Sequence, residues 1–224
     1  TPSTPLPQPV LEAEAGFEIG LLFLELSTRR RFRASGTVIR QQDRLHIRLA
    51  EAYPNCPKYI QRRLPKSVDH IVGAAKDWES GLALSPAGKS IIEQADTFFV
   101  GSVSAAGRMD ASHRGGPVGF VEITPGGVLK VPDYQGNGLF NTLGNIVEDP
   151  RAGLLFIDFE TGALLQLSGE ASLLFNQESD EDVIKTTGTG RYWTFKISGW
   201  RMLRSQTSLQ MEYIDASPFN PQLA

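Results

Sequence analysis

The sequence predicts a mainly β protein, a β-barrel with few helices, and three observations support that prediction. Short apolar or alternating runs bounded by turn residues recur along most of the chain. Two of these runs belong to an internal repeat. Stretches with helical spacing of apolar residues are few and short. Many short strands with few helices favour a barrel over a sandwich.

The repeat joins residues 20–38 (GLLFLELSTRRRFRASGTV) and 153–171 (GLLFIDFETGALLQLSGEA), which align without gaps at an offset of 133 residues, from Gly20 to Gly153. Seven of the nineteen positions are identical, and they include a Thr and a Ser-Gly pair besides apolar residues. In each copy an apolar run ends at a polar turn, and a second run closes on Ser-Gly. This pattern predicts a hairpin with a bulge or bend at the glycine. We interpret the repeat as a duplicated unit.

Other segments follow from local patterns. Strands are predicted at residues 97–104, 118–124, 128–131, 192–197 and 209–214. Helices are predicted at 67–80, from apolar spacing, at 86–95, from a Ser cap followed by Pro, and at 141–148, which ends before Asp-Pro. Residues 176–190, acidic and then rich in Thr and Gly, are predicted to form a mobile loop.

Composition excludes some kinds of partner. The formal net charge of −3 gives no general attraction to nucleic acid or to an anionic membrane, and no apolar run approaches the length of a membrane-spanning helix. The one cysteine, Cys56, cannot form an internal disulfide, so a cytoplasmic location is expected. The three histidines lack the spacing of a metal site.

Residues 112–117 (SHRGGP) combine potential ligand donors with glycines. Ser112, His113 and Arg114 offer donors to an anion, and Gly115 and Gly116 would let backbone amides approach a ligand closely. An alternative reading is that the glycines serve turns and Arg114 is a solvated surface charge.

A second candidate segment begins the helix predicted at 141–148, where Asn141 and Thr142 stand in the first turn. Helix N-termini offer free N–H groups and a favourable dipole to phosphate. A strand bearing Arg beside a helix N-terminus bearing Asn and Thr is therefore a candidate site for one phosphate group, with the turn-and-surface reading as the alternative.

The stretches SHRGGPVGFV (112–121) and VPDYQGNGLFNTLGNIVEDPRAGLLFIDFETG (131–162) resemble the flavin-binding core of proteins related to pyridoxamine 5′-phosphate oxidase. The segments NCPKYIQ (55–61) and SPFNP (217–221) resemble one branch of that family. The resemblance implies a six-stranded Greek-key split β-barrel that dimerises and binds FMN at the interface. It places the FMN phosphate near Ser112, His113, Arg114, Asn141 and Thr142.

Two features depart from the oxidases themselves. Their Arg-Lys pair at the helix entry corresponds to Asn141-Thr142 here, so phosphate binding is expected to rest on Arg114 and on backbone amides. Their C-terminal Arg-His substrate motif has no counterpart in residues 201–208 (RMLRSQTS). Oxidation of pyridoxamine phosphate itself is therefore not implied.

The repeat and the resemblance together suggest a domain organisation. Residues 1–66 would form a first, incomplete split-barrel unit, 67–96 a helical linker, and 97–224 the main flavin-binding unit. The first copy has Arg29-Arg30-Arg31 where the second has Gly162-Ala163-Leu164. We hypothesise that Arg30, Arg31 or Lys58 reaches a flavin bound mainly by the second unit, as in an intrachain pseudo-dimer, with a homodimer as the other possibility. A solvated charge run is the alternative reading of the arginines.

The expected function is that of an FMN-dependent oxidoreductase acting on a small-molecule substrate, with NAD(P)H as a possible reductant. One alternative is a flavin- or haem-binding carrier or sensor without turnover, in which His113 contacts the cofactor. Another is a barrel without ligand that serves assembly.

Overall fold

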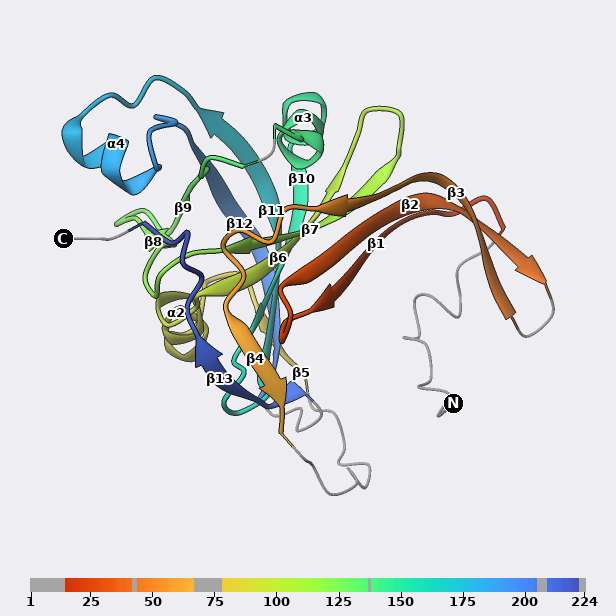
Figure 1. Cartoon of the computed structure of the whole chain (residues 1–224), viewed down its shortest axis with the longest axis horizontal. Helices are drawn as coiled ribbons and strands as arrows, with labels where there is room; N and C mark the ends of the chain where they lie inside the picture. The colour runs from red at the N-terminus through yellow and green to blue at the C-terminus, as the bar shows by residue number, and fades with distance from the viewer. Residues whose placement is uncertain (1–14, 42–43, 67–77, 137, 205–208, 222–224) are drawn as a thin grey trace.

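The computed structural model describes residues 15–41, 44–66, 78–136, 138–204 and 209–221. Its strands, all paired antiparallel, form three open sheets (Figure 1). The first sheet has the order β1 (Glu18–Glu25), β2 (Arg30–Gln41), β3 (Arg44–Asn55). The largest has eight strands: β7 (Met109–Gly115), β6 (Thr97–Val103), β10 (Arg151–Ile157), β11 (Leu164–Leu174), β12 (Tyr192–Leu203), β9 (Leu129–Pro132) and β8 (Glu122–Ile123), with β5 (Trp78–Gly81) also paired to β12. The third pairs β13 (Met211–Asp215) with β4 (Arg62–Pro65).

The chain is thus mainly β, as the sequence predicts, with three short helices in the described residues: α2 (Pro86–Glu93), α3 (Asn141–Glu148) and α4 (Asp180–Lys185). The prediction of α2 is confirmed, with Ser85 as its N-cap, and α3 has the predicted bounds. The strand predicted at 118–124 is shorter, because a turn with positive φ at Gly119 occupies its first half and leaves only β8.

Two predicted segments differ from the structure. The helix expected at 67–80 lies largely outside the described residues, and its last residues form strand β5, whose pairing with Trp200–Leu203 overrides the helical spacing. The loop expected at 176–190 contains α4. Ser179 caps this helix by accepting a hydrogen bond from the Asp182 amide (3.1 Å). Three acidic residues in its first turn favour the helix dipole, which explains why this acidic stretch is ordered as a helix.

Both sequence copies form β-hairpins with the same register. Gly20 pairs with Ser35 in the first hairpin, and the residues 133 positions later, Gly153 and Ser168, pair in the second. A β-bulge follows at the same place in each copy, between Ser35 and Gly36 and between Ser168 and Gly169. The equivalent strands are β1–β2–β3 (the first meander) and β10–β11–β12 (the second meander).

The glycine after each bulge has a steric reason. A Cβ on Gly36 would lie 2.1 Å from the Arg48 carbonyl oxygen, and one on Gly169 would lie 2.2 Å from that of Lys196. Both distances are far inside van der Waals contact, so neither position tolerates a side chain without a shift of the neighbouring strand.

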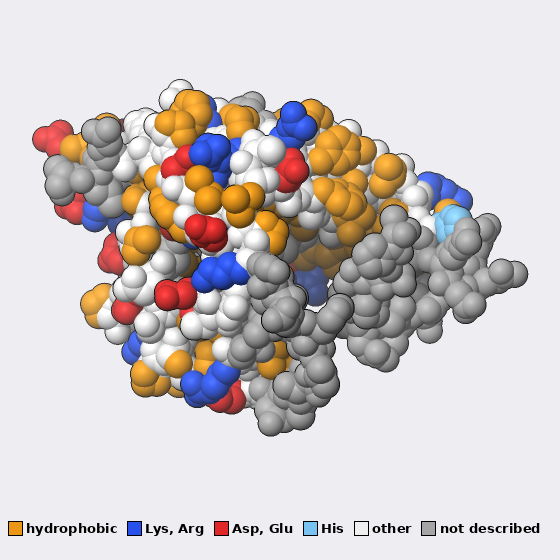
Figure 2. Space-filling model, turned by 60° about the horizontal axis from the view of Figure 1, so that its bottom comes forward, with side chains coloured by type: hydrophobic (Ala, Val, Ile, Leu, Met, Phe, Trp, Pro, Cys, Tyr) orange, Lys and Arg blue, Asp and Glu red, His pale blue; other side chains and the backbone are white. Residues whose placement is uncertain are grey.

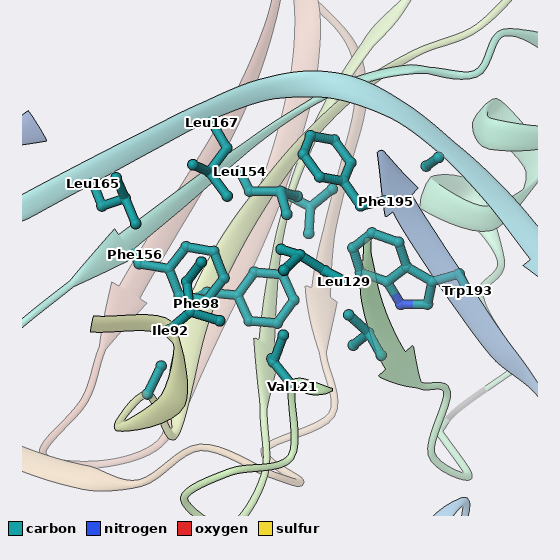
Figure 3. Close-up of a cluster of buried hydrophobic side chains, with 14 of the residues drawn as sticks. Ile92, Phe98, Val121, Leu129, Leu154, Phe156, Leu165, Leu167, Trp193 and Phe195 are labelled. Carbon is teal, nitrogen blue, oxygen red and sulfur yellow. The ribbon is translucent and has the colours of Figure 1, made fainter. Parts of the chain in front are cut away.

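The main core lies against the eight-stranded sheet (Figure 3). Trp193, Phe98, Phe156 and Phe195 are fully buried there, and the rings of Phe98 and Phe156 stack with centroids 4.8 Å apart. Helix α2 contributes Ile92, and α3 contributes Leu143 and Ile146. This core holds α3, which borders the candidate site, and β6, which pairs with β7.

The first meander extends as a long arm from this body (Figure 1) and lies against β7, the edge strand of the large sheet. Contact is close at Gly20, where a Cβ would lie 2.8 Å from the Asp110 carbonyl carbon. Hydrophobic side chains gather on the near face of the arm in Figure 2. The Cα partners Phe23 and Phe32 are both exposed, which places them on the face away from the packed side.

Candidate functional site

A cavity of about 240 Å³ lies where the first meander meets β7. Its walls come from the end of β3 and the segment that follows it, from β2 and β7, from the loop after β9, from the start of α3 and from Arg191. The lining side chains that matter for charge and hydrogen bonding are Arg31, Arg33, Asn55, Lys58, Tyr59, His113, Arg114, Asp133, Tyr134 and Arg191. Segments far apart in the sequence therefore build one pocket.

Strand alternation directs Arg31 and Arg33 to this cavity. The two arginines are two residues apart in β2, so they share one face of the strand, and Phe32 between them is turned outward. Arg33 is buried and approaches Asp110 of β7 at 3.3 Å. Strand β2 of the first copy thus supplies cations to the second part of the chain.

Arg31 contacts His113, which is buried in β7. Its Nη1 lies 3.1 Å from His113 Nδ1. Burial, followed by the charges of Arg33 and Arg114, lowers the pKa of Arg31 to about 10, so the guanidinium keeps its charge at neutral pH. Burial and the charge of Arg31 also hold the pKa of His113 well below its usual value, and the imidazole is therefore neutral.

Asp133 is the carboxylate of this cavity. It is buried after β9 and accepts hydrogen bonds from Arg114 Nη1 (3.1 Å) and from Arg191 Nε and Nη2 (3.0 and 2.9 Å). One carboxylate is thus shared between two arginines. Burial lowers the pKa of Arg114, although Asp133 acts in the opposite direction.

The cavity has an excess of positive charge. Five cationic side chains line it (Arg31, Arg33, Lys58, Arg114 and Arg191), whereas Asp133 is the single acidic residue among the described lining residues. Within the described part of the chain, eight buried polar side-chain atoms have no hydrogen-bond partner, and five of them belong to cavity residues: Arg31, Arg33, Asn55, His113 and Arg114. Four of the five are ring or guanidinium nitrogens, and the fifth is Asn55 Oδ1, an acceptor. Buried polar atoms rarely remain unpaired, so the four nitrogens are typical of a binding site for an anionic or acceptor-rich ligand.

The glycines of the SHRGG strand have a different role from the one expected. A Cβ on Gly115 would lie 1.9 Å from the Tyr59 carbonyl oxygen, and one on Gly116 would lie 2.7 Å from the Phe120 ring. The space that these glycines leave open is therefore filled by this chain. Gly115 permits the segment after β3 to cross β7, and it is this crossing that brings Lys58 and Tyr59 to the cavity.

Gln61 joins three of the four segments that resemble the family named above. It is almost fully buried. Its Nε2 donates to the Gly116 carbonyl (3.0 Å), and its Oε1 accepts from the Ser217 amide (2.7 Å) and from Asn220 Nδ2 (3.1 Å). The NCPKYIQ, SHRGG and SPFNP segments therefore meet behind the cavity and hold its wall in place.

The SHRGG strand and the start of α3 lie side by side, as expected. Thr142 Oγ1 donates to Asp110 Oδ2 (2.8 Å) and lies 3.0 Å from Ser112 Oγ. Ser112 and Thr142 are both buried and do not line the cavity, and Asn141 borders a smaller depression of about 90 Å³ together with Asp110. The anion near the start of α3 is thus Asp110 of the chain itself.

The other predicted site residues divide into two groups. Arg31, Lys58, His113, Arg114 and Gly115 line the cavity. Arg30 is exposed beside the outer groove of the first meander, and Gly116 borders a groove on the other side of the SHRGG strand.

Sequence reasoning missed Arg33, Tyr59, Asp133 and Arg191. Strand periodicity could have found Arg33, since it lies two residues after Arg31. Tyr59 lies within the NCPKYIQ motif and Asp133 at the end of a predicted strand, and their roles depend on tertiary contacts. Tyr59 has a positive φ of 65° and donates to the Gln135 carbonyl (3.0 Å). Its ring packs against that of Tyr134, with centroids 4.8 Å apart and planes tilted by 36°.

Two kinds of feature are absent from the described residues. No cluster of three or more His, Cys, Asp or Glu side chains could hold a metal ion there. In the same residues, no helix has the length and apolar character needed to cross a bilayer.

Most of the segments around this site lie in a part of the chain that matches a known protein family. Residues 84–214 match the family model described as pyridoxamine 5′-phosphate oxidase. That match covers more than half of the chain and includes β6, β7, α3 and the second meander. No curated protein matches the sequence.

Several solved structures are similar at low identity. A putative pyridoxamine 5′-phosphate oxidase from Lactobacillus delbrueckii is 13% identical, with 52% of this chain and 92% of that one covered and a TM-score of 0.40. A pyridoxamine 5′-phosphate oxidase-related, FMN-binding protein from Nostoc punctiforme is 11% identical (61% and 100% covered, TM-score 0.35). The haem storage protein HutZ from Vibrio cholerae is 15% identical (58% and 94% covered, TM-score 0.34).

Proposed function

The chain belongs to the pyridoxamine 5′-phosphate oxidase family, and from this premise we propose that it is a flavoprotein that binds FMN in the cavity between the first meander and β7. The observation that carries the proposal is the group of buried, unpaired donors on Arg31, Arg33, His113 and Arg114, in a lining with five cations and one carboxylate. FMN offers a dianionic phosphate and a ring rich in acceptors, and both fit this set of donors.

Different residues of the cavity would bind the phosphate and the rest of FMN. Arg31 and Lys58 are the cations that would hold the phosphate, because Arg33 is already paired with Asp110, and Arg114 and Arg191 with Asp133. Arg114 would add its unpaired Nε as a further donor. Tyr59 and Tyr134 give part of the lining an aromatic surface. Bound flavin would supply the redox chemistry, whereas this chain provides binding, orientation and electrostatics.

We also propose that the two meanders derive from a duplication. Their shared register and bulge support this idea. The result would be a pseudo-dimer within one chain, with a split barrel of six-stranded Greek-key type. In it, Arg31 and Lys58 from the region of the first meander complete a site that residues 97–224 mainly build. The domain limits at 66 and 96 remain part of this proposal, and the pairing of β4 with β13 shows that the ends of the two parts are joined in one sheet.

The reaction class follows from the cofactor. We expect an oxidoreductase of the cytoplasm that acts on a small-molecule substrate, with NAD(P)H as a candidate reductant. Cation-rich lining around a flavin would favour an anionic substrate or a negatively charged reduced ring. The alternative is a carrier or sensor that binds the cofactor without turnover.

The test is a titration of the purified chain with FMN. Binding is monitored by flavin fluorescence and by absorbance at about 450 nm, where flavoproteins absorb. Arg31→Met should weaken FMN binding about 10- to 100-fold, the loss of one charge-assisted hydrogen bond of about 1.5–3 kcal/mol. Arg30→Met is the matched control, because it removes the same charge from the neighbouring exposed position and should change affinity less than about 3-fold.

The outcomes separate the alternatives. Equal effects of the two substitutions, or no uptake of FMN by the wild type, would refute the site. Anaerobic bleaching of the bound flavin by NADH or NADPH would establish turnover. Stable flavin binding without reduction by either nucleotide, or by amines and alcohols offered as substrates, would favour the carrier.

A further inference from the structure

We infer that Arg31 is a positioning residue that holds His113 in one tautomer, with the proton on Nε2, so that His113 serves the cavity as a hydrogen-bond donor and not as a ligand to haem iron. Only the identity of the ligand rests on the proposed function, since the tautomer is a property of the chain alone.

The contact between the two side chains fixes the direction of the hydrogen bond. Arg31 Nη1 lies 3.1 Å from His113 Nδ1. A guanidinium carries donors and has no acceptor, so Nδ1 must accept. A neutral imidazole with an unprotonated Nδ1 carries its proton on Nε2.

The surroundings keep the imidazole neutral. His113 is buried, and the charges that lower its pKa are those of Arg31, Arg114, Arg33 and Arg63. The carboxylates of the same region, Asp110 and Asp133, are paired with Arg33 and with Arg114 and Arg191. The nearest ring is Phe99, edge-on with centroids 6.0 Å apart, and it offers no charge. A second positive charge on the ring would also turn the contact with Arg31 into one between two donors. The neutral form with Nε2–H is the form that satisfies all of these contacts.

The state of Nε2 decides which cofactor can use it. In the structure His113 Nε2 is buried and has no hydrogen-bond partner, so it is a donor available to an acceptor atom. Flavin carbonyls, ring nitrogens and phosphate oxygens are acceptors. Haem iron requires the lone pair of a ring nitrogen, but Nε2 uses its lone pair in the ring and Nδ1 is engaged by Arg31. The cavity therefore discriminates against a cofactor that needs His113 as an axial ligand.

The direct test measures the tautomer in the chain without cofactor. Two-bond ¹H–¹⁵N correlation spectra report which ring nitrogen carries the proton, and His113→Gln identifies the signal of His113. We expect an unprotonated Nδ1 and a protonated Nε2 from pH 6 to 8. A protonated Nδ1, or an imidazolium in that range, would overturn the inference.

The second test adds haemin to the wild type, His113→Ala, Arg31→Met and the control Arg30→Met. We expect the wild type and His113→Ala to give the same absorption spectrum and affinity within 2-fold, because His113 does not ligate the iron. Loss of a low-spin Soret band in His113→Ala would overturn the inference. In Arg31→Met the His113 spectrum should show both tautomers, whereas Arg30→Met should keep one; an unchanged single tautomer in Arg31→Met would show that Arg31 is not the positioning residue.

These outcomes are separable from those of the proposed function. Failure to bind FMN would remove the flavin but leave the tautomer and the haemin comparison intact. An FMN complex combined with a protonated Nδ1 would retain the proposed function and remove this inference.

Discussion

The first and second meanders have the same strand register and the same bulge, yet their equivalent side chains have opposite surroundings. Phe156 in β10 is fully buried, whereas Phe23, the identical residue 133 positions earlier, is 58% exposed. Their cross-strand partners differ in the same way: Leu165 is fully buried and Phe32 is 40% exposed. One meander is the centre of an eight-stranded sheet with a core, and the other lies at the edge of that body.

The comparison shows that backbone geometry and chemical role are specified separately. The Ser-Gly bulge and the apolar run recur in both meanders, and they determine the hairpin. The residues after the turn do not recur: Arg31 and Arg33 occupy the positions of Leu164 and Gln166. Those two arginines turn the first meander into a wall of the cavity, while the apolar residues of the second meander form part of the core.

The largest expected difference between the meanders is at the equivalent phenylalanines. Phe156→Ala should lower the free energy of unfolding by about 3–5 kcal/mol, because a large side chain leaves a cavity in the packed core. Phe23→Ala should change it by less than about 1 kcal/mol, because most of that ring is in water. Urea unfolding of both variants measures the pair. Similar losses would mean that the outer face of the first meander is covered in solution.

The bulge glycines should behave alike. Gly36→Ala and Gly169→Ala each place a Cβ against a carbonyl oxygen of the neighbouring strand, and each should cost about 1–3 kcal/mol of stability. Gly101→Ala in β6 is the control, because its Cβ would meet nothing closer than 3.9 Å. Thermal unfolding of the three variants compares them. A cost at Gly169 alone would show that the first bulge is not required for folding.

The smallest effect is a dependence of stability on pH. The pKa of His113 in the folded chain lies well below 6.5, its usual value and the one expected after unfolding. Below pH 6.5 the unfolded chain takes up a proton that the folded chain does not. Folding stability therefore falls as the pH falls, by up to about 1.4 kcal/mol per pH unit from this residue.

Urea unfolding between pH 7.5 and 5.5 measures that slope. His113→Gln should make it shallower, whereas His46→Gln, at an exposed position of β3, should leave it unchanged. Equal slopes in the wild type and His113→Gln would show that His113 is protonated in the folded chain.

Local patterns predicted the hairpins, α2 and α3, because each depends on residues close in sequence: turn residues, the Ser85 cap and the Pro after it. They could not predict β5 or the position of Tyr59, which depend on pairing with β12 and on the crossing over Gly115. The candidate site shows the same division. His113, Arg114, Arg31 and Lys58 were identified from motifs and from the repeat, whereas Asp133 and Arg191 enter through an ion pair that only the folded chain forms.

The cavity takes its walls from two strand systems that one polypeptide links covalently. Where such walls come from separate subunits, dilution dissociates the subunits and removes the site. Here Arg31 stays within reach of His113 at any protein concentration, because the chain between them fixes their local concentration. Ligand affinity should therefore be the same at nanomolar and at micromolar protein, and a bound ligand should couple the unfolding of the arm to that of the body.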